Sequence, residues 1–219
     1  MKTFSGSDDI MITAHSGCDG TEMNTMEYLK YAVSIPVDAL EIDVRRSEDG
    51  ALVLGHGPAE GSAQLPLETA FRFLSDKVVK INCDMKEAGL SNDILDCARR
   101  CAVETRRIIF TGVIDEHMTR QTDAQVFVNA EELIPGLDDS PLRPESVAAL
   151  IRRCREAGYS TVNIDYRQCD DAMIQMLRKA GIGLSVWTVD DPEKIRAFMN
   201  EGVRNITTNL VKEACRRKP

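Results

Sequence analysis

The sequence predicts an α/β protein that folds as a single-domain (β/α)8 TIM barrel over residues 1–219. From Ile10 to the C-terminus, short runs of β-branched residues alternate with longer amphipathic stretches. We count eight such units over about 210 residues, or roughly 27 residues each, the size expected of a βα repeat. No Ser/Gly linker or shift in composition divides the chain, whose length can bury one large core. A doubly wound open sheet is the alternative.

In the first half of the chain we expect strands at residues 11–14, 39–45, 78–84 and 107–110. The second strand continues through a turn at residues 48–50 into a return segment, 51–54. Amphipathic patterns predict helices at 24–34 with Asn24 as N-cap, from Pro66 through Leu67, Ala70, Phe71 and Leu74, at 91–102, and near 115–122.

The second half repeats the alternation, with strands expected at residues 125–128, 161–165, 183–188 and 204–208. Helices are expected at 144–157, 170–180 and 192–200, with a last one from about Leu210. Pro144 and Pro192 lie at helix starts, and Gly158, Gly181 and Gly202 follow helix ends. This placement of proline and glycine is typical of helix termini.

Composition limits the functional class. The chain is 43% hydrophobic and 28% charged, with a mean hydropathy of −0.23. No apolar run could span a bilayer, and the polar N-terminus has no signal-like core, so we expect a cytoplasmic protein without stable membrane insertion. A net charge of −8 argues against a nucleic-acid binder. It is compatible with a small anionic substrate, because a metal can reverse the local charge, and with a homo-oligomer.

Cysteine spacing gives no sign of a zinc site or a disulfide framework. The seven cysteines are odd in number and scattered, and no CxxC pair occurs. Cys97 and Cys101 are four residues apart, which indicates helix packing. We therefore expect reduced thiols at Cys18, Cys83, Cys97, Cys101, Cys154, Cys169 and Cys215.

Glu41 and Asp43 stand two residues apart in a predicted strand. Residues two apart project from the same face of a strand, so the two carboxylates point together. Carboxylates on one buried wall are costly unless a positive charge lies between them, and Mg²⁺ and Ca²⁺ prefer carboxylate oxygens. The pattern therefore predicts a divalent cation site. A half-exposed edge strand with alternating charge is the alternative.

In a barrel the active site lies at the C-terminal ends of the strands. Solvated strand ends explain several of the polar residues found there. They do not easily explain why a histidine and three acids, at positions 15, 41, 43 and 84, fall on three consecutive strands. The polar and aromatic residues at the predicted ends are His15, Glu41, Asp43, Asp84, Lys86, Thr111, Asn129, Asp165, Trp187, Thr188 and Asn209.

Several short motifs occur in an order that resembles the glycerophosphodiester phosphodiesterase family. They are Ala14-His-Ser-Gly17, Met23-Asn-Thr25, Leu40-Glu-Ile-Asp-Val44, the stretch 48–56 ending in His56, Ile81-Asn-Cys-Asp-Met-Lys86, Val186-Trp-Thr-Val189 and the stretch 202–209. The corresponding family pattern is His-Arg-Gly, Glu-Asn-Thr, Glu-x-Asp, Asp-Gly leading to His-Asp, Glu-x-Lys, Trp-Thr-Val and a closing Thr-Asp. The resemblance spans essentially the whole barrel.

The resemblance implies a (β/α)8 barrel that hydrolyses glycerophosphodiesters to an alcohol and sn-glycerol 3-phosphate, in glycerol and lipid metabolism. It implies one Mg²⁺ or Ca²⁺ bound by Glu41, Asp43 and Asp84, which leave positions free for water and a phosphate oxygen. His15 and His56 would be the proton-transfer pair, with base and acid not assigned between them. The expected partner is a small-molecule phosphodiester, contacted by Lys86, Ser16 and Trp187.

The chain departs from the family pattern at five motif positions. Ser16 replaces the arginine, and serine cannot replace a bidentate phosphate clamp. Met23 replaces an acid beside Glu22, Gly57 and Asn209 replace aspartates, and Asp84 replaces a glutamate with a side chain one methylene shorter.

About twenty residues separate His56 from the next strand, where many family members insert a capping subdomain. We therefore expect no sizeable cap and a more open pocket. His117 belongs to none of the motifs and is expected to be a surface helix residue.

Two other functions use the same constellation. One is a phosphodiesterase or lyase on another phosphodiester, with internal attack giving a cyclic phosphate. The related sphingomyelinase D-like barrels, where an aspartate third ligand is also seen, act in this way. The other is a barrel that binds a phosphorylated ligand with little turnover, as the missing arginine at Ser16 would suggest.

Overall fold

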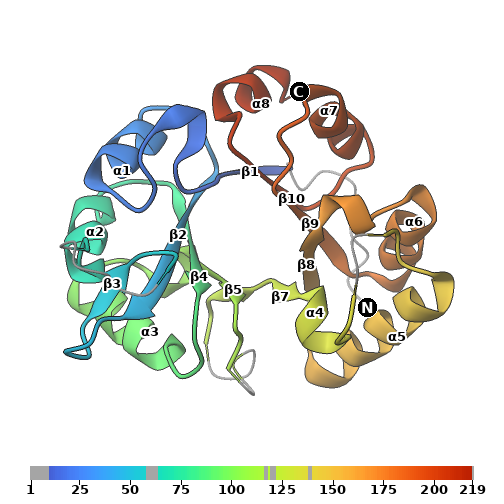
Figure 1. Cartoon of the computed structure of the whole chain (residues 1–219), viewed down its shortest axis with the longest axis horizontal. Coiled ribbons are helices and arrows are strands. Elements are labelled where there is room, and N and C mark those ends of the chain that lie inside the picture. The colour runs from blue at the N-terminus through green and yellow to red at the C-terminus, as the bar shows by residue number, and fades with distance from the viewer. Residues whose placement is uncertain (1–9, 58–63, 116–117, 119–121, 138–139, 219) are drawn as a thin grey trace.

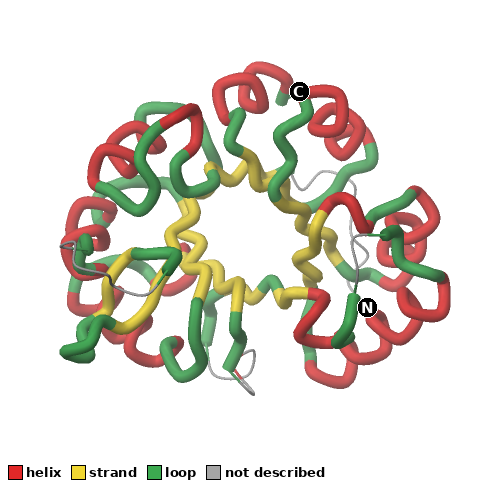
Figure 2. The backbone as a smooth tube through the Cα atoms, viewed as in Figure 1, coloured by secondary structure: helices red, strands yellow, loops and turns green. Residues whose placement is uncertain are grey.

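Parallel strands form a ring with helices around its outside (Figures 1 and 2). The computed structural model describes residues 10–57, 64–115, 118, 122–137 and 140–218. Strand β1 (Met11–Ala14) pairs in parallel with β2 (Ala39–Arg46) on one side and with β10 (Asn205–Thr208) on the other. The first and last strands of the chain are thus neighbours, which excludes the open sheet and confirms the predicted barrel.

The hydrogen-bonded order around the ring is β6-β5-β4-β2-β1-β10-β9-β8-β7. Its two ends, β6 (Gln125–Val126) and β7 (Val128–Asn129), are consecutive in the chain and separated by Phe127 alone. The Phe127 N–H donates to the Phe110 carbonyl at 2.9 Å, so this interrupted strand holds one position in the ring. The other members are β4 (Lys80–Met85), β5 (Ile108–Gly112), β8 (Thr161–Asp165) and β9 (Gly183–Trp187).

Strand β2 extends beyond the ring and turns back as an antiparallel hairpin. Its partner β3 (Leu52–Leu54) pairs with β2 alone, with Arg45 opposite Val53. This is the predicted return segment, and it brings His56 back toward the end of β2.

Apart from the short helix α4, which the sequence pattern did not predict, the described helices agree closely with that pattern. Gly158 and Gly181 have φ of 80° and 72° at the ends of α5 and α6, a conformation that glycine adopts without steric cost. None of the described helices is both long and apolar enough to cross a membrane. The helices are α1 (Met26–Val33), α2 (Leu67–Leu74), α3 (Ser91–Arg100), α4 (Ala130–Leu133), α5 (Pro144–Ala157), α6 (Asp171–Ala180), α7 (Pro192–Asn200) and α8 (Val211–Arg217).

Some predicted boundaries were wrong. The N-cap of α1 is Thr25, whose Oγ1 accepts a hydrogen bond from the Tyr28 N–H at 3.2 Å, whereas Asn24 has φ of 59° and turns its side chain to Asp43. Strand β4 begins at Lys80, because Val78 is 96% exposed and has no sheet neighbour to pack against. The helix expected near residues 115–122, and His117 within it, fall largely outside the described residues, as does segment 58–63.

The inside of the ring is layered. Four residues, Met11, Ala39, Ile109 and Phe127, form a small apolar cluster near the N-terminal ends of the strands.

Beyond this cluster, a chain of hydrogen bonds crosses the polar interior of the ring. Thr13 donates to Asn205 at 2.6 Å, and Asn205 donates to Ser185 at 2.9 Å. Ser185 donates to Asn163 at 2.7 Å, and Asn163 donates to Asn129 at 2.8 Å. Buried polar groups are tolerable when they are hydrogen-bonded in this way.

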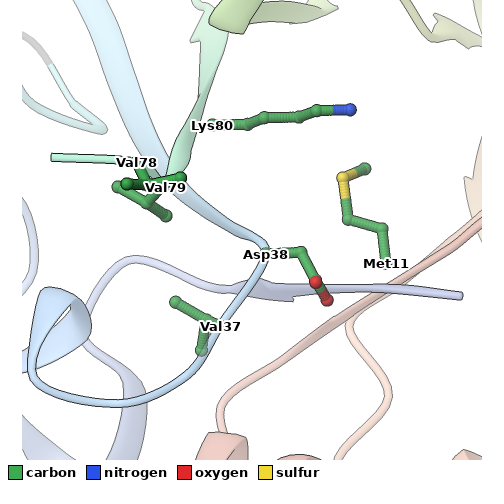
Figure 3. Close-up of a pocket in the computed structure, with 6 residues that line it drawn as sticks. All are labelled: Met11, Val37, Asp38, Val78, Val79 and Lys80. Carbon is green, nitrogen blue, oxygen red and sulfur yellow. The ribbon is translucent and has the colours of Figure 1, made fainter. Parts of the chain in front are cut away.

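A pocket of about 320 Å³ opens at the N-terminal end of the barrel (Figure 3). It is lined by Met11, Val37, Asp38, Val78, Val79 and Lys80, which lie at or before the first residues of β1, β2 and β4. The predicted acids lie toward the opposite ends of β2 and β4. This pocket is therefore separate from the predicted active site.

Candidate metal centre and active site

Three carboxylates converge at the C-terminal end of the barrel. Glu41 and Asp43 come from β2 and Asp84 from β4, where Asp43 and Asp84 are direct partners in the parallel ladder. Each residue offers an oxygen within 4.8 Å of the oxygens of the other two. Glu41 and Asp43 are 5% and 3% exposed. The fold thus brings together the three acids that the sequence singled out.

The triad fits a hard divalent cation. Metal–oxygen distances of about 2.0–2.6 Å allow ligand oxygens to stand up to about 5 Å apart, which the observed spacing satisfies. Among the described residues, no other group of three metal-type side chains lies this close. The donor set is all oxygen, as Mg²⁺ and Ca²⁺ prefer.

Glu41 and Asp43 differ in their electrostatics. Burial and repulsion from Asp43 and Asp84 raise the pKa of Glu41 well above its usual range, although the Ser16 N–H donates to its Oε2 at 2.8 Å. Burial also disfavours ionised Asp43, but the Lys86 ammonium and a hydrogen bond from Asn24 outweigh it and lower the Asp43 pKa. The site therefore holds one carboxylate that resists ionisation beside one that is stabilised in its charged form.

The ammonium of Lys86 contacts two of the three carboxylates. Its Nζ lies 2.6 Å from Asp43 Oδ1 and also forms an ion pair with Asp84. Burial disfavours the ammonium, but the two carboxylates outweigh this and raise the Lys86 pKa to about 12. The predicted phosphate-binding lysine is thus positioned directly against the triad.

Asn24 supports the site, whereas sequence reasoning placed it in a helix cap and in the Met23-Asn-Thr25 motif without giving it a contact to the acids. Its Nδ2 donates to Asp43 Oδ2 at 2.7 Å, and its Oδ1 accepts from the Asp43 N–H at 3.0 Å. The Asn24 N–H donates to Ser16 Oγ at 2.9 Å. Ser16 is 1% exposed, and its observed contacts are to Asn24 and Glu41. A contact between Ser16 and a phosphate therefore stays a prediction.

His15 follows β1 and is held by a relay of two residues. Its Nδ1 lies 3.0 Å from Asn209 Oδ1, while Asn209 donates to Asp190 from Nδ2 and from its backbone N–H, each at 2.8 Å. A carboxylate only accepts hydrogen bonds, so the Asn209 amide group must face Asp190 and its carbonyl must face His15. Neutral His15 therefore carries its proton on Nδ1, and Nε2 is the unprotonated nitrogen. The sequence offered no signal for Asp190 beyond its place after the Trp-Thr-Val motif.

His56 approaches the triad from the β2–β3 hairpin. Its Nδ1 lies 3.5 Å from Asp43 Oδ1, and its side chain is 69% exposed. The two predicted histidines thus reach the centre differently: His56 lies beside Asp43, and His15 directly precedes Ser16, whose N–H binds Glu41.

Thr111 and Gly112 of β5 support Asp84. Thr111 Oγ1 lies 2.9 Å from Asp84 Oδ1 and 3.1 Å from Asn82 Oδ1. Gly112 has φ of 77°, and a Cβ there would lie 2.2 Å from the Met85 carbonyl oxygen and 2.7 Å from Asp84 Oδ1. Only glycine allows β5 to approach the third carboxylate this closely.

The remaining strand-end residues divide into two groups. Asp165 forms an ion pair with Arg167 at 2.6 Å, and Asn129 binds Asn163, so both are engaged outside the triad. Trp187 is half-buried at the end of β9, and its Nε1 is buried without a hydrogen-bond partner in the described part of the chain. The substrate contact expected of Trp187 stays a prediction.

Comparison with known proteins finds a sequence relative at low identity. No family model matches the chain. The chain is 24% identical over 246 residues to glycerophosphodiester phosphodiesterase GDPD4 of Arabidopsis thaliana, covering 91% of this chain and 70% of the relative.

Solved structures share the fold at low identity. A putative glycerophosphoryl diester phosphodiesterase from Agrobacterium tumefaciens matches with a TM-score of 0.81 at 15% identity, covering 96% of this chain and 97% of that one. An Oleispira antarctica phosphodiesterase, in complex with the product sn-glycerol-3-phosphate, matches with a TM-score of 0.74 at 15% identity, with the same coverages.

Fold and site together define a (β/α)8 barrel with three converging carboxylates at the C-terminal ends of its strands. This barrel is similar in sequence, at 24% identity, to a glycerophosphodiester phosphodiesterase, and similar in fold to solved structures of phosphodiesterases.

Proposed function

We propose that this protein hydrolyses glycerophosphodiesters to an alcohol and sn-glycerol 3-phosphate, using one Mg²⁺ or Ca²⁺ held by Glu41, Asp43 and Asp84. The observation that carries the proposal is the position of His56 beside Asp43 and of His15 beside the Ser16–Glu41 contact. Cleavage of a phosphodiester needs one group to take a proton from the nucleophile and another to protonate the leaving oxygen. Two imidazoles beside an oxygen-donor cation site provide both.

A bound divalent cation would neutralise charge on the phosphate and polarise one of its oxygens. Lys86 adds a second positive charge. When a bound cation neutralises Asp43 and Asp84, the Lys86 ammonium can turn from these carboxylates to the phosphate. The Asn209–Asp190 relay orients His15 and makes Nε2 the nitrogen that exchanges the proton. Asn24 and Thr111 hold Asp43 and Asp84 in place.

The proposal includes the sequence-based expectations of a cytoplasmic location, a role in glycerol and lipid metabolism, and one barrel domain without a sizeable cap. The location follows from composition, the metabolic role from the resemblance, and the missing cap from the short segment between His56 and the next strand. The small-molecule phosphodiester remains the expected partner.

The test is metal-dependent release of sn-glycerol 3-phosphate from a glycerophosphodiester, measured with Mg²⁺, with Ca²⁺ and after chelation. His15→Ala and Glu41→Ala should each abolish release. Glu68→Ala is the matched control, because Glu68 is an exposed α2 residue paired with Arg72. Activity that survives both site substitutions would rule out the assigned site.

A second candidate reaction uses the same residues, with attack by a substrate hydroxyl giving a cyclic phosphate. The aspartate at position 84, in register with Asp43, favours it, because the related sphingomyelinase D-like barrels also have an aspartate third ligand. Phosphorus NMR of the product separates a cyclic phosphate from sn-glycerol 3-phosphate. Tight metal and phosphate binding without turnover on any diester would instead indicate a binding protein.

A further inference from the structure

Arg45 and Arg46 are adjacent in β2 but have different partners. Arg46 is fully engaged: its guanidinium forms an ion pair with Asp93 and contacts the carbonyls of Gly50 and Gly89, each at 3.4 Å. Arg45 makes one hydrogen bond, from Nη1 to the His56 carbonyl at 3.2 Å. Within the part of the chain that the structure describes, no carboxylate lies within ion-pair distance of Arg45. Most of its five N–H donors are therefore available.

The position of Arg45 relates it to the metal centre. Glu41, Asp43 and Arg45 alternate along β2 and so share one face of the strand. Two residues of strand advance about 7 Å, which places Arg45 beyond Asp43 on the side where the hairpin leaves the ring. Its contact with the His56 carbonyl fixes the guanidinium on the His56 flank of the site.

The chemistry of Arg45 suits an anionic ligand. A guanidinium presents a planar set of donors that matches a carboxylate or phosphate in a bidentate manner. The phosphodiester itself is expected at the carboxylate triad, against Lys86. Arg45 lies farther out, so its available donors face the part of a substrate that extends beyond the phosphate.

We propose that Arg45 is a specificity-determining residue that binds an anionic group on the alcohol part of the substrate. This inference rests on the proposed function. The glycerol part of a glycerophosphodiester carries no charge, so a negatively charged partner for Arg45 can come only from the alcohol part. The enzyme then prefers diesters whose alcohol bears a carboxylate or a further phosphate.

The test compares glycerophosphoserine with glycerophosphoethanolamine, which differ by one carboxylate. For the wild-type enzyme we expect kcat/KM about tenfold higher for glycerophosphoserine, the effect of one charge-assisted contact. In Arg45→Gln this ratio should fall to within about twofold of one, and Arg45→Lys should retain part of it. Arg152→Gln, which removes an exposed guanidinium from α5, is the matched control and should keep the wild-type ratio.

Two results would overturn the proposal. One is an unchanged ratio in Arg45→Gln, and the other is an equal loss on both substrates, which would mean that Arg45 acts on the shared phosphate or on His56. If the wild type turns over neither substrate, the proposed function has failed. A measurement of ligand binding then tests the role of Arg45 independently of turnover. Calorimetry on the Mg²⁺-loaded wild type should then show that phosphoserine binds about tenfold more tightly than phosphoethanolamine. In Arg45→Gln the two ligands should bind with equal affinity. Equal wild-type affinities would overturn the assignment.

Discussion

The backbone N–H of Ser16 donates a hydrogen bond to Glu41 Oε2 at 2.8 Å, and this links the loop after β1 to the metal centre. The contact uses the main chain, so it does not depend on the side chain at position 16. The serine that stands where the family pattern has arginine therefore keeps the support of Glu41, and its hydroxyl instead accepts from the Asn24 N–H. The guanidinium lost at position 16 leaves Lys86 and Arg45 as the basic groups of the described site.

Replacement of Glu41 by Gln should stabilise the metal-free protein and abolish its response to Mg²⁺. The folded-state pKa of Glu41 lies above its unfolded value of about 4.3, so the wild type loses stability as pH rises above that value. The variant lacks this loss and should be more stable at pH 7 by on the order of 1 kcal/mol, with no advantage at pH 4. Urea unfolding at the two pH values, with and without Mg²⁺, checks this against Glu68→Gln. A Mg²⁺-induced stabilisation retained by the variant would contradict the assigned ligand.

Replacement of Lys86 by Met should separate phosphate binding from metal binding. Without the ammonium, Asp43 and Asp84 repel each other unrelieved, and we expect the metal-free protein to lose about 2–4 kcal/mol of unfolding free energy. Mg²⁺ should restore much of this loss, whereas diester hydrolysis should stay about a hundredfold below wild type. Thermal unfolding with and without Mg²⁺, together with kcat/KM, gives both readouts. Lys77→Met, at a partly exposed pair with Asp76, is the control, and near-normal hydrolysis in Lys86→Met would remove the phosphate role.

Replacement of Asp190 by Asn should remove the preference of neutral His15 for the tautomer with its proton on Nδ1. The asparagine can present its amide group to Asn209, so the orientation of the Asn209 carbonyl toward His15 is no longer enforced. The chain has three histidines, so nitrogen NMR can follow each ring, with His15 assigned by its loss in His15→Gln. We expect a single Nδ1–H form of neutral His15 in the wild type, a mixture in Asp190→Asn, and about a tenfold to hundredfold loss of kcat.

Asp191→Asn is the control for this change. Asp191 is adjacent and caps α7, and asparagine caps a helix equally well. An Nδ1–H form of His15 that persists unchanged in Asp190→Asn would show that the relay does not set the tautomer.

Replacement of Gly112 by Ala should be strongly destabilising. The added Cβ meets the Met85 carbonyl oxygen at 2.2 Å and Asp84 at 2.7 Å, in a backbone conformation that alanine adopts only with strain. We expect a loss of more than about 2 kcal/mol in unfolding free energy, together with weaker metal binding. Gly136→Ala is the matched control, because Gly136 has φ of 83° with no atom within 4 Å of the added Cβ. Equal losses in the two variants would mean that close approach to β4 is unimportant.

Much of the fold and of the site could be predicted from the sequence because the signals are local. Alternation of β-branched and amphipathic segments, proline at helix starts and glycine after helix ends predicted the barrel and nearly all described elements. Glu41, Asp43 and Asp84 could be singled out because strand periodicity and strand order place them at one end of the ring. The predicted starts of α1 and β4 were wrong, because Asn24 binds Asp43 and does not cap the helix, and because Val78 is exposed and lies outside the strand.

By itself, then, the sequence determined the fold class, the three acids, the two histidines and the resemblance to one family, since these depend on residue type, spacing and chain order. Only the tertiary structure decided which distant groups support them. Asn24 binds Asp43, Asp190 orients Asn209 and thereby His15, Lys86 lies between two carboxylates, and Arg45 has no carboxylate partner within the described chain. These relations depend on side-chain directions and on registers between strands far apart in the chain, which no local pattern encodes.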